Sequence, residues 1–454
     1  MKKIIEKFRN IWSIEELRER IINTLIFLLI YRIGTFVILP GIDSEMLAGL
    51  QGQTDSGVLS LVNLFAGGAF ARGAIFALGI MPYISASIVI QLMSIAVPYF
   101  QRLQKEGEDG RRKINQITRL LTIAITGVQA YGYLVNIKNT AGNGDALLFM
   151  TSPGAMSVGM FMFINVLLLT AGTMFTMWLG EKITDKGLGN GISLIIMIGI
   201  IAGLPSSLVS EFFFKLEGGK LIFFVVEMAI WLAVILSVVL LVQGTRRIPV
   251  NYAKQMRGSN MYGGARQYIP LKVNAAGVMP IIFAQAIMFI PATVVGFFTE
   301  DGSTNSFVNA MSDYTSWTYN ITFALMIILF TYFYTAITVN PNQMAEDLKR
   351  NGGFIPGIKP GKDTSNYIDS IMSRITFPGS LYLALVSVFP AVAIAYSVNQ
   401  GFAQFYGGTS LLIMVGVVLD TLQQIESYLL MRHYDGLIKG SKLKGRAGAV
   451  GASI

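Results

Sequence analysis

Ten long apolar segments constrain the fold of this chain more than any other feature of its sequence. Each holds about 20 mostly apolar residues, the length that an α-helix needs to cross a bilayer. Only 13% of the residues are charged, against about 25% in a soluble protein. The sequence therefore predicts an all-α polytopic membrane protein. The expected spans are roughly residues 21–39, 73–97, 116–137, 156–179, 190–206, 221–242, 274–298, 318–339, 375–396 and 408–430.

The positive charges are divided unevenly among the segments that connect these spans. If the N-terminus is cytoplasmic and the spans alternate, 28 Lys and Arg residues lie on the cytoplasmic side and four on the other. Cytoplasmic loops of membrane proteins carry such an excess. We therefore expect a protein of the cytoplasmic (inner) membrane with both termini in the cytoplasm. The two longest basic loops, 243–273 and 340–374, would face the cytosol.

The segments that flank the spans suggest a simple domain order. In residues 1–20, apolar side chains recur at helical spacing among charged ones, which predicts an amphipathic helix on the membrane surface. A solvated arm is the alternative. Residues 21–206 and 207–430 would form two halves of five spans each, and residues 431–454 a cytoplasmic tail.

Segment 57–72 is apolar but too short to span the membrane. Apolar stretches of this length are more often re-entrant, interfacial or buried. Gly67 and Gly68 weaken any helix here, and Arg72 needs water or a partner. We expect either a mobile half-helix folded back into a cavity or a fixed interfacial helix.

A short motif occurs at the same place in each half. Gly79-Ile-Met-Pro82 lies in the second span and Gly277-Val-Met-Pro280 in the seventh. Interrupted spans at corresponding positions indicate repeat architecture with a functional path at the interface of the repeats. We expect the prolines to interrupt both spans.

Few residues are suited to catalysis or metal binding. The chain has no cysteine and a single histidine, His433, which leaves thiolate, zinc and histidine chemistry almost nothing to use. Glu227 is the one charge expected deep within a span, and such charges are expected to be isolated from one another. An interhelical pair or a position at the membrane interface is the expected role of each, ahead of a relay of protons or ions. Gly187–Gly191 lacks the strand and the Gly-Lys-Ser/Thr of a phosphate loop. We expect no cofactor and no enzymatic activity.

Several stretches, in order along nearly the whole chain, resemble one family, the SecY protein-translocation channels. They are Tyr31–Thr35, Pro40–Asp43, Phe76–Ile88, Lys105–Arg112, Met177–Glu181, Gly189–Ile192, Arg246–Arg247, Asn251–Lys254, Pro270–Asn274, Asn340–Pro341, Pro356–Gly361 and Gly407–Ile413.

The resemblance implies ten helices in two inverted halves around an hourglass pore. A ring of apolar side chains would form the constriction, because a narrow hydrophobic passage excludes water and ions. Isoleucines at helical spacing are otherwise core or lipid-facing residues. The implied ring is Ile80, Ile84, Ile192, Ile196, Ile282 and Ile413.

Further site residues follow from the same resemblance. A plug would occupy residues 61–72, including Leu64, Phe65, Gly67, Gly68 and Arg72. A lateral gate would open between the second and third spans and the seventh and eighth, with Ser85, Ile88, Gln91, Gln129, Gln285 and Ile290 along it. The three glutamines are expected to tie the closed gate by hydrogen bonds or simply to pack between helices.

The basic loops would dock a motor or the ribosome, through Arg246, Arg247, Lys254, Arg257, Arg266 and Lys359. The family usually has arginine at the position of Lys359, and lysine lacks the planar fork of arginine. The implied partners are the SecE and SecG subunits, the SecA ATPase, the ribosome with its RNA, preprotein signal sequences and anionic lipid. A dimer is a further expectation.

Two other functions are compatible with a chain of apolar spans. An inverted-repeat secondary transporter would need a coupling carboxylate at a solute site near the middle of the membrane. An intramembrane enzyme would need convergent catalytic groups, and it ranks last because the spans contain no cysteine or histidine.

Overall fold

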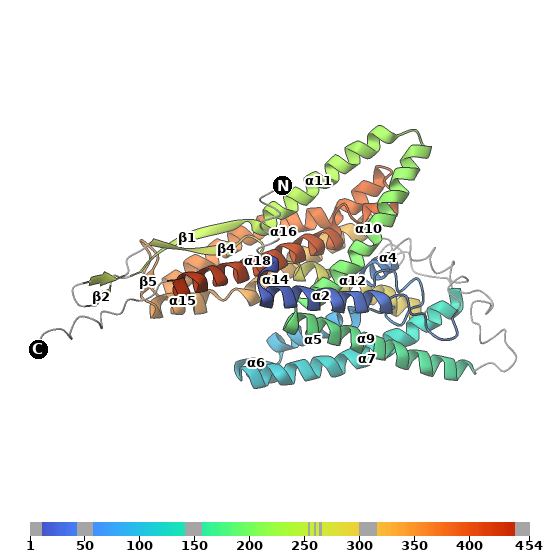
Figure 1. The fold of residues 1–454 in the computed structure, drawn as a ribbon, viewed down its shortest axis with the longest axis horizontal. Helices are drawn as coiled ribbons and strands as arrows, with labels where there is room; N and C mark the ends of the chain where they lie inside the picture. The colour runs from blue at the N-terminus through green and yellow to red at the C-terminus, as the bar shows by residue number, and fades with distance from the viewer. Residues whose placement is uncertain are drawn as a thin grey trace, which may run out of the picture.

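The computed structural model describes residues 11–42, 58–140, 157–252, 255–257, 260–262, 266–298 and 316–440. Most of these residues are helical, and the long helices run side by side along the longest axis of the molecule (Figure 1). A small sheet lies at one end of the bundle and the short helix α4 toward the other.

The first half of the chain contains seven of the labelled helices. They are α2 (Glu15–Gly34), α4 (Val58–Phe65), α5 (Met81–Ala96), α6 (Pro98–Lys105), α7 (Glu108–Thr140), α9 (Val158–Lys186) and α10 (Gly191–Glu217).

The second half contains the other helices and all the named strands of the described residues. Its helices are α11 (Leu221–Gln243), α12 (Met279–Phe298), α14 (Trp317–Thr338), α15 (Pro341–Arg350), α16 (Lys362–Ala395), α17 (Gln400–Ala403) and α18 (Gly408–Gly440). Its strands are β1 (Thr245–Tyr252), β2 (Gln255–Arg257), β3 (Asn260–Tyr262), β4 (Arg266–Lys272) and β5 (Gly353–Phe354).

Ten helical segments match the ten expected spans. Within the described residues, seven helices are long and apolar enough to cross a membrane on their own, and α5 with α6 makes an eighth candidate that bends by 96°. The remaining two are α2, which carries charges at both of its ends, and α12, of which Met279–Met288 is a shorter apolar helix. The chain is a multi-pass, mostly helical membrane protein.

Pro82 and Pro280 begin helices rather than interrupting them, which corrects the expectation from the sequence. Helix α5 starts at Met81 and α12 at Met279, so each proline lies in a first turn, where its missing N–H costs no hydrogen bond. Gly79 and Gly277 precede them with φ of +53° and +64°. The motif therefore builds the same turn-to-helix junction in both halves, which supports the repeat.

The second span is shorter than predicted because residues 66–80 form successive turns instead of helix. Gly67, Gly68 and Gly73 adopt positive φ there, a conformation that side chains disfavour. Helix α4 and these turns together make up segment 58–80, which folds back into the protein and buries Phe65 and Phe70.

Helix α10 continues eleven residues beyond the predicted end of the fifth span at residue 206, to Glu217. Pro205 lies inside the helix without ending it, because membrane helices can satisfy the freed carbonyl in other ways. The extension carries Glu211 and Lys215, both buried. Lys215 is one of the four cations expected on the outer side of the membrane, in the segment after the fifth span, and the structure instead places it within the extended helix.

The two basic loops contribute strands to one sheet with the order β4-β1-β5. Strand β1 pairs with β4 in antiparallel register from Thr245↔Lys272 to Asn251↔Arg266. On its other side β1 pairs with β5 through Asn251↔Phe354. The sequence did not predict these strands. They join loops 243–273 and 340–374 into one small domain at the end of the bundle (Figure 1).

Candidate functional site

Four helices and the end of α4 meet around a small apolar cavity at the centre of the bundle. Its volume is about 10 Å³, and Ile84, Ile196, Ile282 and Ile413 line it from α5, α10, α12 and α18. A cavity needs at least about 10–15 Å³ to hold one water molecule. The structure therefore brings together four of the six predicted isoleucines around a space with room for at most one water.

The other two predicted isoleucines belong to the same packed cluster. Ile80 is buried at the start of α5, and Ile192 packs against the cluster one turn before Ile196. We call the six residues the isoleucine ring. The side chain of Asn190 caps α10 by accepting hydrogen bonds from the N–H groups of Ile192 and Ser193, which fixes the start of this helix.

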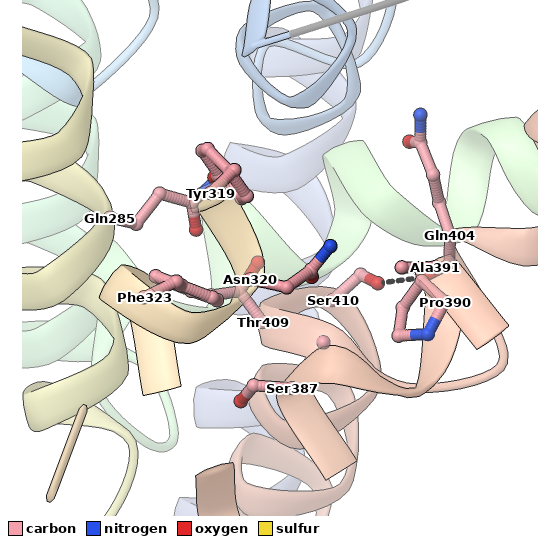
Figure 2. Close-up of a pocket in the computed structure, with 11 residues that line it drawn as sticks. Gln285, Tyr319, Asn320, Phe323, Ser387, Pro390, Ala391, Gln404, Thr409 and Ser410 are labelled. Atoms are coloured by element: carbon pink, nitrogen blue, oxygen red, sulfur yellow. Dashed lines mark hydrogen bonds between the residues drawn. The ribbon is translucent and has the colours of Figure 1, made fainter. Parts of the chain in front are cut away.

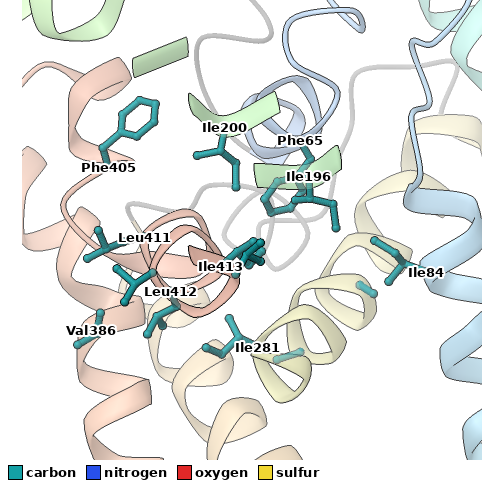
Figure 3. Packing of buried hydrophobic residues seen from close by; sticks show 14 of the residues in the cluster. Phe65, Ile84, Ile196, Ile200, Ile281, Val386, Phe405, Leu411, Leu412 and Ile413 are labelled. Atoms are coloured by element: carbon teal, nitrogen blue, oxygen red, sulfur yellow. The ribbon is translucent and has the colours of Figure 1, made fainter. Parts of the chain in front are cut away.

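Sequence reasoning missed two apolar residues that also line the cavity, Met81 and Ala286. They lie three residues before Ile84 and four residues after Ile282, so they share a helix face with these isoleucines. That spacing could have identified them. Figure 3 shows Phe65, Ile84, Ile196 and Ile413 converging from separate elements.

Segment 58–80 closes the cavity on one side, with Phe65 in its wall. The backbone of this segment lies directly on α10: a methyl group built at Gly199 would lie 2.6 Å from the carbonyl oxygen of Phe65. The Arg32 Nη1 group on α2 donates a hydrogen bond of 2.8 Å to the carbonyl oxygen of Gly67. The close approach at Gly199 on α10 and the hydrogen bond from Arg32 on α2 thus hold segment 58–80 in place.

A larger cavity of about 480 Å³ lies between segment 58–80, α10 and the start of α17, and none of its lining residues belongs to the isoleucine ring. Arg32, Asn63 and Arg72 are among its polar lining residues. The guanidinium groups of Arg32 and Arg72 both lie against the ring of Phe36, at 4.9 and 4.4 Å from its centroid. Arg72, which the sequence suggested needs water or a partner, thus packs on an aromatic ring and donates a hydrogen bond to the carbonyl oxygen of Thr35, beside a polar, open cavity.

A third cavity of about 40 Å³, with several polar side chains among its lining residues, lies between α12, α14, α16 and the start of α18 (Figure 2). Gln285 reaches both this cavity and the apolar one. Its Oε1 atom is buried and accepts no hydrogen bond from the described residues. An amide therefore adjoins the isoleucine ring on the α12 side.

The predicted gate residues lie on α5, α7 and α12. Ile88 is buried, Ser85 is partly buried, and the amide of Gln91 donates a hydrogen bond to Ser87 on its own helix. Gln129 is partly buried on α7. The side chain of Ile290 lies outside the described residues, so the gate contact at this position stays a prediction.

The predicted docking cations lie on the sheet and beside it. Arg246 and Arg247 are exposed on β1, and Lys359 is exposed in the turn that follows β5. Arg257 and Arg266 belong to β2 and β4, but their side chains, Lys254 and the side chain of His433 lie outside the described residues.

Comparisons with known proteins place this architecture in one family. The profile of the SecY family matches residues 74–422. A protein translocase subunit SecY from Halalkalibacterium halodurans is 46% identical over 440 residues, covering 95% of this chain and 99% of the relative. The corresponding subunit from Streptomyces scabiei is 42% identical, covering 96% of this chain and 100% of the relative.

The fold matches those of solved channels. A structure described as that of a protein conducting channel aligns with a TM-score of 0.61 at 17% identity, covering 94% of this chain and 95% of that one. Sec61 from a canine ribosome-channel complex aligns with a TM-score of 0.59 at 16% identity, covering 94% and 95% of the two chains. The chain belongs to the SecY family of protein translocase subunits.

Proposed function

We propose that this chain forms the pore through which unfolded polypeptides cross the cytoplasmic membrane and hydrophobic segments enter it. The observation that carries the proposal is the isoleucine ring, where helices of both halves enclose an apolar cavity of about 10 Å³. The ring lies on the interface of the two halves, so a small separation of the halves widens it.

An apolar ring suits a pore that passes chains but holds back ions. Water leaves a narrow hydrophobic constriction, and an ion without its hydration shell crosses it only at high cost. Branched side chains such as Ile196 and Ile413 offer no fixed hydrogen bonds to a passing polypeptide. The ring can therefore fit closely around chains of different sequence.

Segment 58–80 would act as the plug of the resting pore. Its contact with Gly199 and its hydrogen bond from Arg32 support this role. Phe65 lines the constriction cavity, so displacement of the segment would remove one wall of the closed site. The cavity of about 480 Å³ beside it would then be the vestibule on the external side.

The lateral gate would lie where α5 faces α12 across the constriction, with α7 and α14 beside them. Met81 and Ile84 line the cavity from α5, opposite Ile282 and Ala286 from α12. A hydrophobic segment in the pore would leave through this opening, because its transfer into lipid is favourable.

The sheet β4-β1-β5 would be the docking platform for a motor ATPase or a ribosome on the cytoplasmic side. The exposed cations Arg246, Arg247 and Lys359 support this role, since they attract acidic protein surfaces and RNA phosphates. The excess of Lys and Arg on the same side supports cytoplasmic termini. SecA, SecE, SecG, the ribosome and signal sequences are the partners we propose.

The solute-carrier alternative finds little support. Its coupling carboxylate would have to face a solute cavity. Glu211 and Glu227 instead hold Lys215 between them, with Nζ–Oε1 distances of 3.5 and 2.7 Å. They line none of the three cavities described above.

The test is transport by the purified chain with its partner subunits in proteoliposomes, with SecA and ATP supplied outside. We expect a preprotein to become protected from added protease. Omission of ATP should abolish the protection, and a preprotein without a signal sequence serves as control. Vesicles that accumulate no protected preprotein, although SecA binds them, would contradict the proposal.

A further inference from the structure

A buried cluster of three charges lies at the end of the α10–α11 hairpin. Lys215 on α10 contacts Glu211 one turn earlier and Glu227 on α11, with Nζ–Oε1 distances of 3.5 and 2.7 Å. The side chains of Glu211 and Lys215 are 0% and 4% exposed, and that of Glu227 is 11% exposed. The Lys215–Glu227 pair joins two helices, as expected for a charge within a span. Glu211 enlarges it to a cluster, which corrects the expectation that such charges are isolated.

The cluster also holds the turn between α16 and α17. Lys215 Nζ donates a hydrogen bond of 3.0 Å to the carbonyl oxygen of Ser397. The backbone N–H of Asn399 donates one of 2.9 Å to Glu211 Oε2. Ser397 is the one non-glycine residue with positive φ in the described part of the chain, at +64°. A strained turn of the second half is thus tied to the last helix of the first half.

The opposite end of α10 is tied to the second half as well. The N–H of Gly189, just before the cap of α10, donates a hydrogen bond of 2.8 Å to Gln424 Oε1 on α18. Arg20 of α2 donates to the carbonyl oxygen of Gly187 and lies over the ring of Tyr428 on α18. Polar contacts therefore join the halves at both ends of α10.

The helices around the constriction define two seams between the halves. Along one seam α10 meets α17 and α18, and along the other α5 faces α12. The polar ties described above all lie on the α10 seam. Buried charges hold their geometry strongly, because separating one partner leaves an uncompensated charge in a medium that solvates it poorly.

We propose that Glu211, Lys215 and Glu227 are positioning residues that keep the α10 seam closed while the α5–α12 seam opens for substrate. The cluster acts on the pore through α10, which carries two members of the isoleucine ring. This inference rests on the proposed function, since it names the residues that hold the other seam of the same pore.

The sequence and geometry offer a direct test with a disulfide. A Cβ atom built at Gly401 on α17 would lie 4.0 Å from Cβ of Ser207 on α10, within the range that disulfides span. The chain has no native cysteine, so Ser207→Cys/Gly401→Cys is the only possible bridge. We expect the oxidised protein, with its partner subunits in proteoliposomes, to export preprotein at the rate of the reduced protein.

A second pair on the other seam separates this inference from the proposed function. Oxidised Ser85→Cys/Ile290→Cys should stall export until it is reduced. Inhibition by the Ser85 pair alone supports the inference. If the Ser207→Cys/Gly401→Cys disulfide also inhibits export, and reduction restores export, the inference is wrong. Export unaffected by either formed disulfide overturns the proposed gate, and the inference with it.

A substitution then tests the charges themselves. In the Ser207→Cys/Gly401→Cys background, Lys215→Met should slow disulfide formation severalfold because the seam loosens, and Lys215→Arg should restore most of the rate. If Lys215→Met does not accumulate, the neutral triple variant Glu211→Gln/Lys215→Met/Glu227→Gln buries no unpaired charge and is expected to show the same slowing. If the disulfide forms at the parental rate in Lys215→Met, the cluster does not hold the α10 seam closed. The same conclusion holds for the triple variant where it is used instead.

Discussion

The contact between Gly199 and segment 58–80 gives the sharpest single-residue test of the resting pore. A methyl group at position 199 would lie 2.6 Å from the carbonyl oxygen of Phe65 and 3.2 Å from the amide nitrogen of Gly67. Non-bonded heavy atoms are most stable at about 3.5–4.0 Å. In Gly199→Ala the segment must therefore move away from α10 by about 1 Å.

Two opposing terms determine how Gly199→Ala changes the balance between the bound and displaced positions of segment 58–80. Overpacking of this kind costs about 1–3 kcal/mol, while alanine in place of glycine within a helix stabilises it by about 1 kcal/mol. The helix term acts in both the seated and displaced states, so the clash falls on the seated state alone. A bias of one or two kcal/mol raises the displaced population about 5- to 30-fold.

The assay is ion conductance of the resting channel in planar bilayers, together with preprotein export. Gly199→Ala should leak more ions at rest and still export. Gly203→Ala, one turn along α10, is the matched control, because its methyl would meet Leu64 and Phe405 at ordinary distances of 3.4 and 3.7 Å. If Gly199→Ala accumulates normally and conducts no more than Gly203→Ala, segment 58–80 does not seal the pore.

Three further predictions concern the ring, the seat of the plug and the docking surface. Ile196→Asn should hydrate the constriction, raising resting conductance and the export of a substrate with a defective signal, whereas Ile321→Asn, at a position that is 56% exposed, should do neither. Arg32→Gln removes a charged hydrogen bond worth about 1.5–3 kcal/mol and should also increase resting conductance. A resting conductance equal to that of the parent would show that this hydrogen bond does not hold segment 58–80 in place. Reversing Arg246 and Arg247 to Glu should weaken ribosome binding and make its salt dependence shallower by about two counterions. If the ribosome affinity and its dependence on salt concentration are unchanged, these charges serve only to orient the spans in the membrane.

The spans could be predicted from the sequence because hydropathy and length are local properties. The C-terminal end of α10 could not, because Glu211 and Lys215 appear solvated in the sequence. Their partners, Glu227 and Asn399, lie 16 and 188 residues away from Glu211 along the chain. Burial of these charges depends on contacts that no sequence window contains. Pro205 added to the error, since it commonly ends a helix in water.

The strands of the basic loops were missed for a similar reason. Strand β5 has two residues and exists only because it pairs with β1, about a hundred positions earlier. The isoleucine ring, by contrast, could be predicted, but only with the help of the family resemblance. Its members could be named from the family resemblance, but isoleucines such as Ile196 and Ile321 carry no local mark that separates a side chain lining the central cavity from an exposed one. Only the assembled halves make that distinction.

The central claim is that a translocating polypeptide passes through the isoleucine ring, and the absence of native cysteine makes it directly measurable. A preprotein with one cysteine is stalled partway through a channel that carries Ile196→Cys, then oxidised. The account predicts a disulfide between channel and preprotein at Ile196→Cys and none at Ile321→Cys. Efficient export with no adduct at Ile196→Cys, for any cysteine position along the stalled chain, would contradict it.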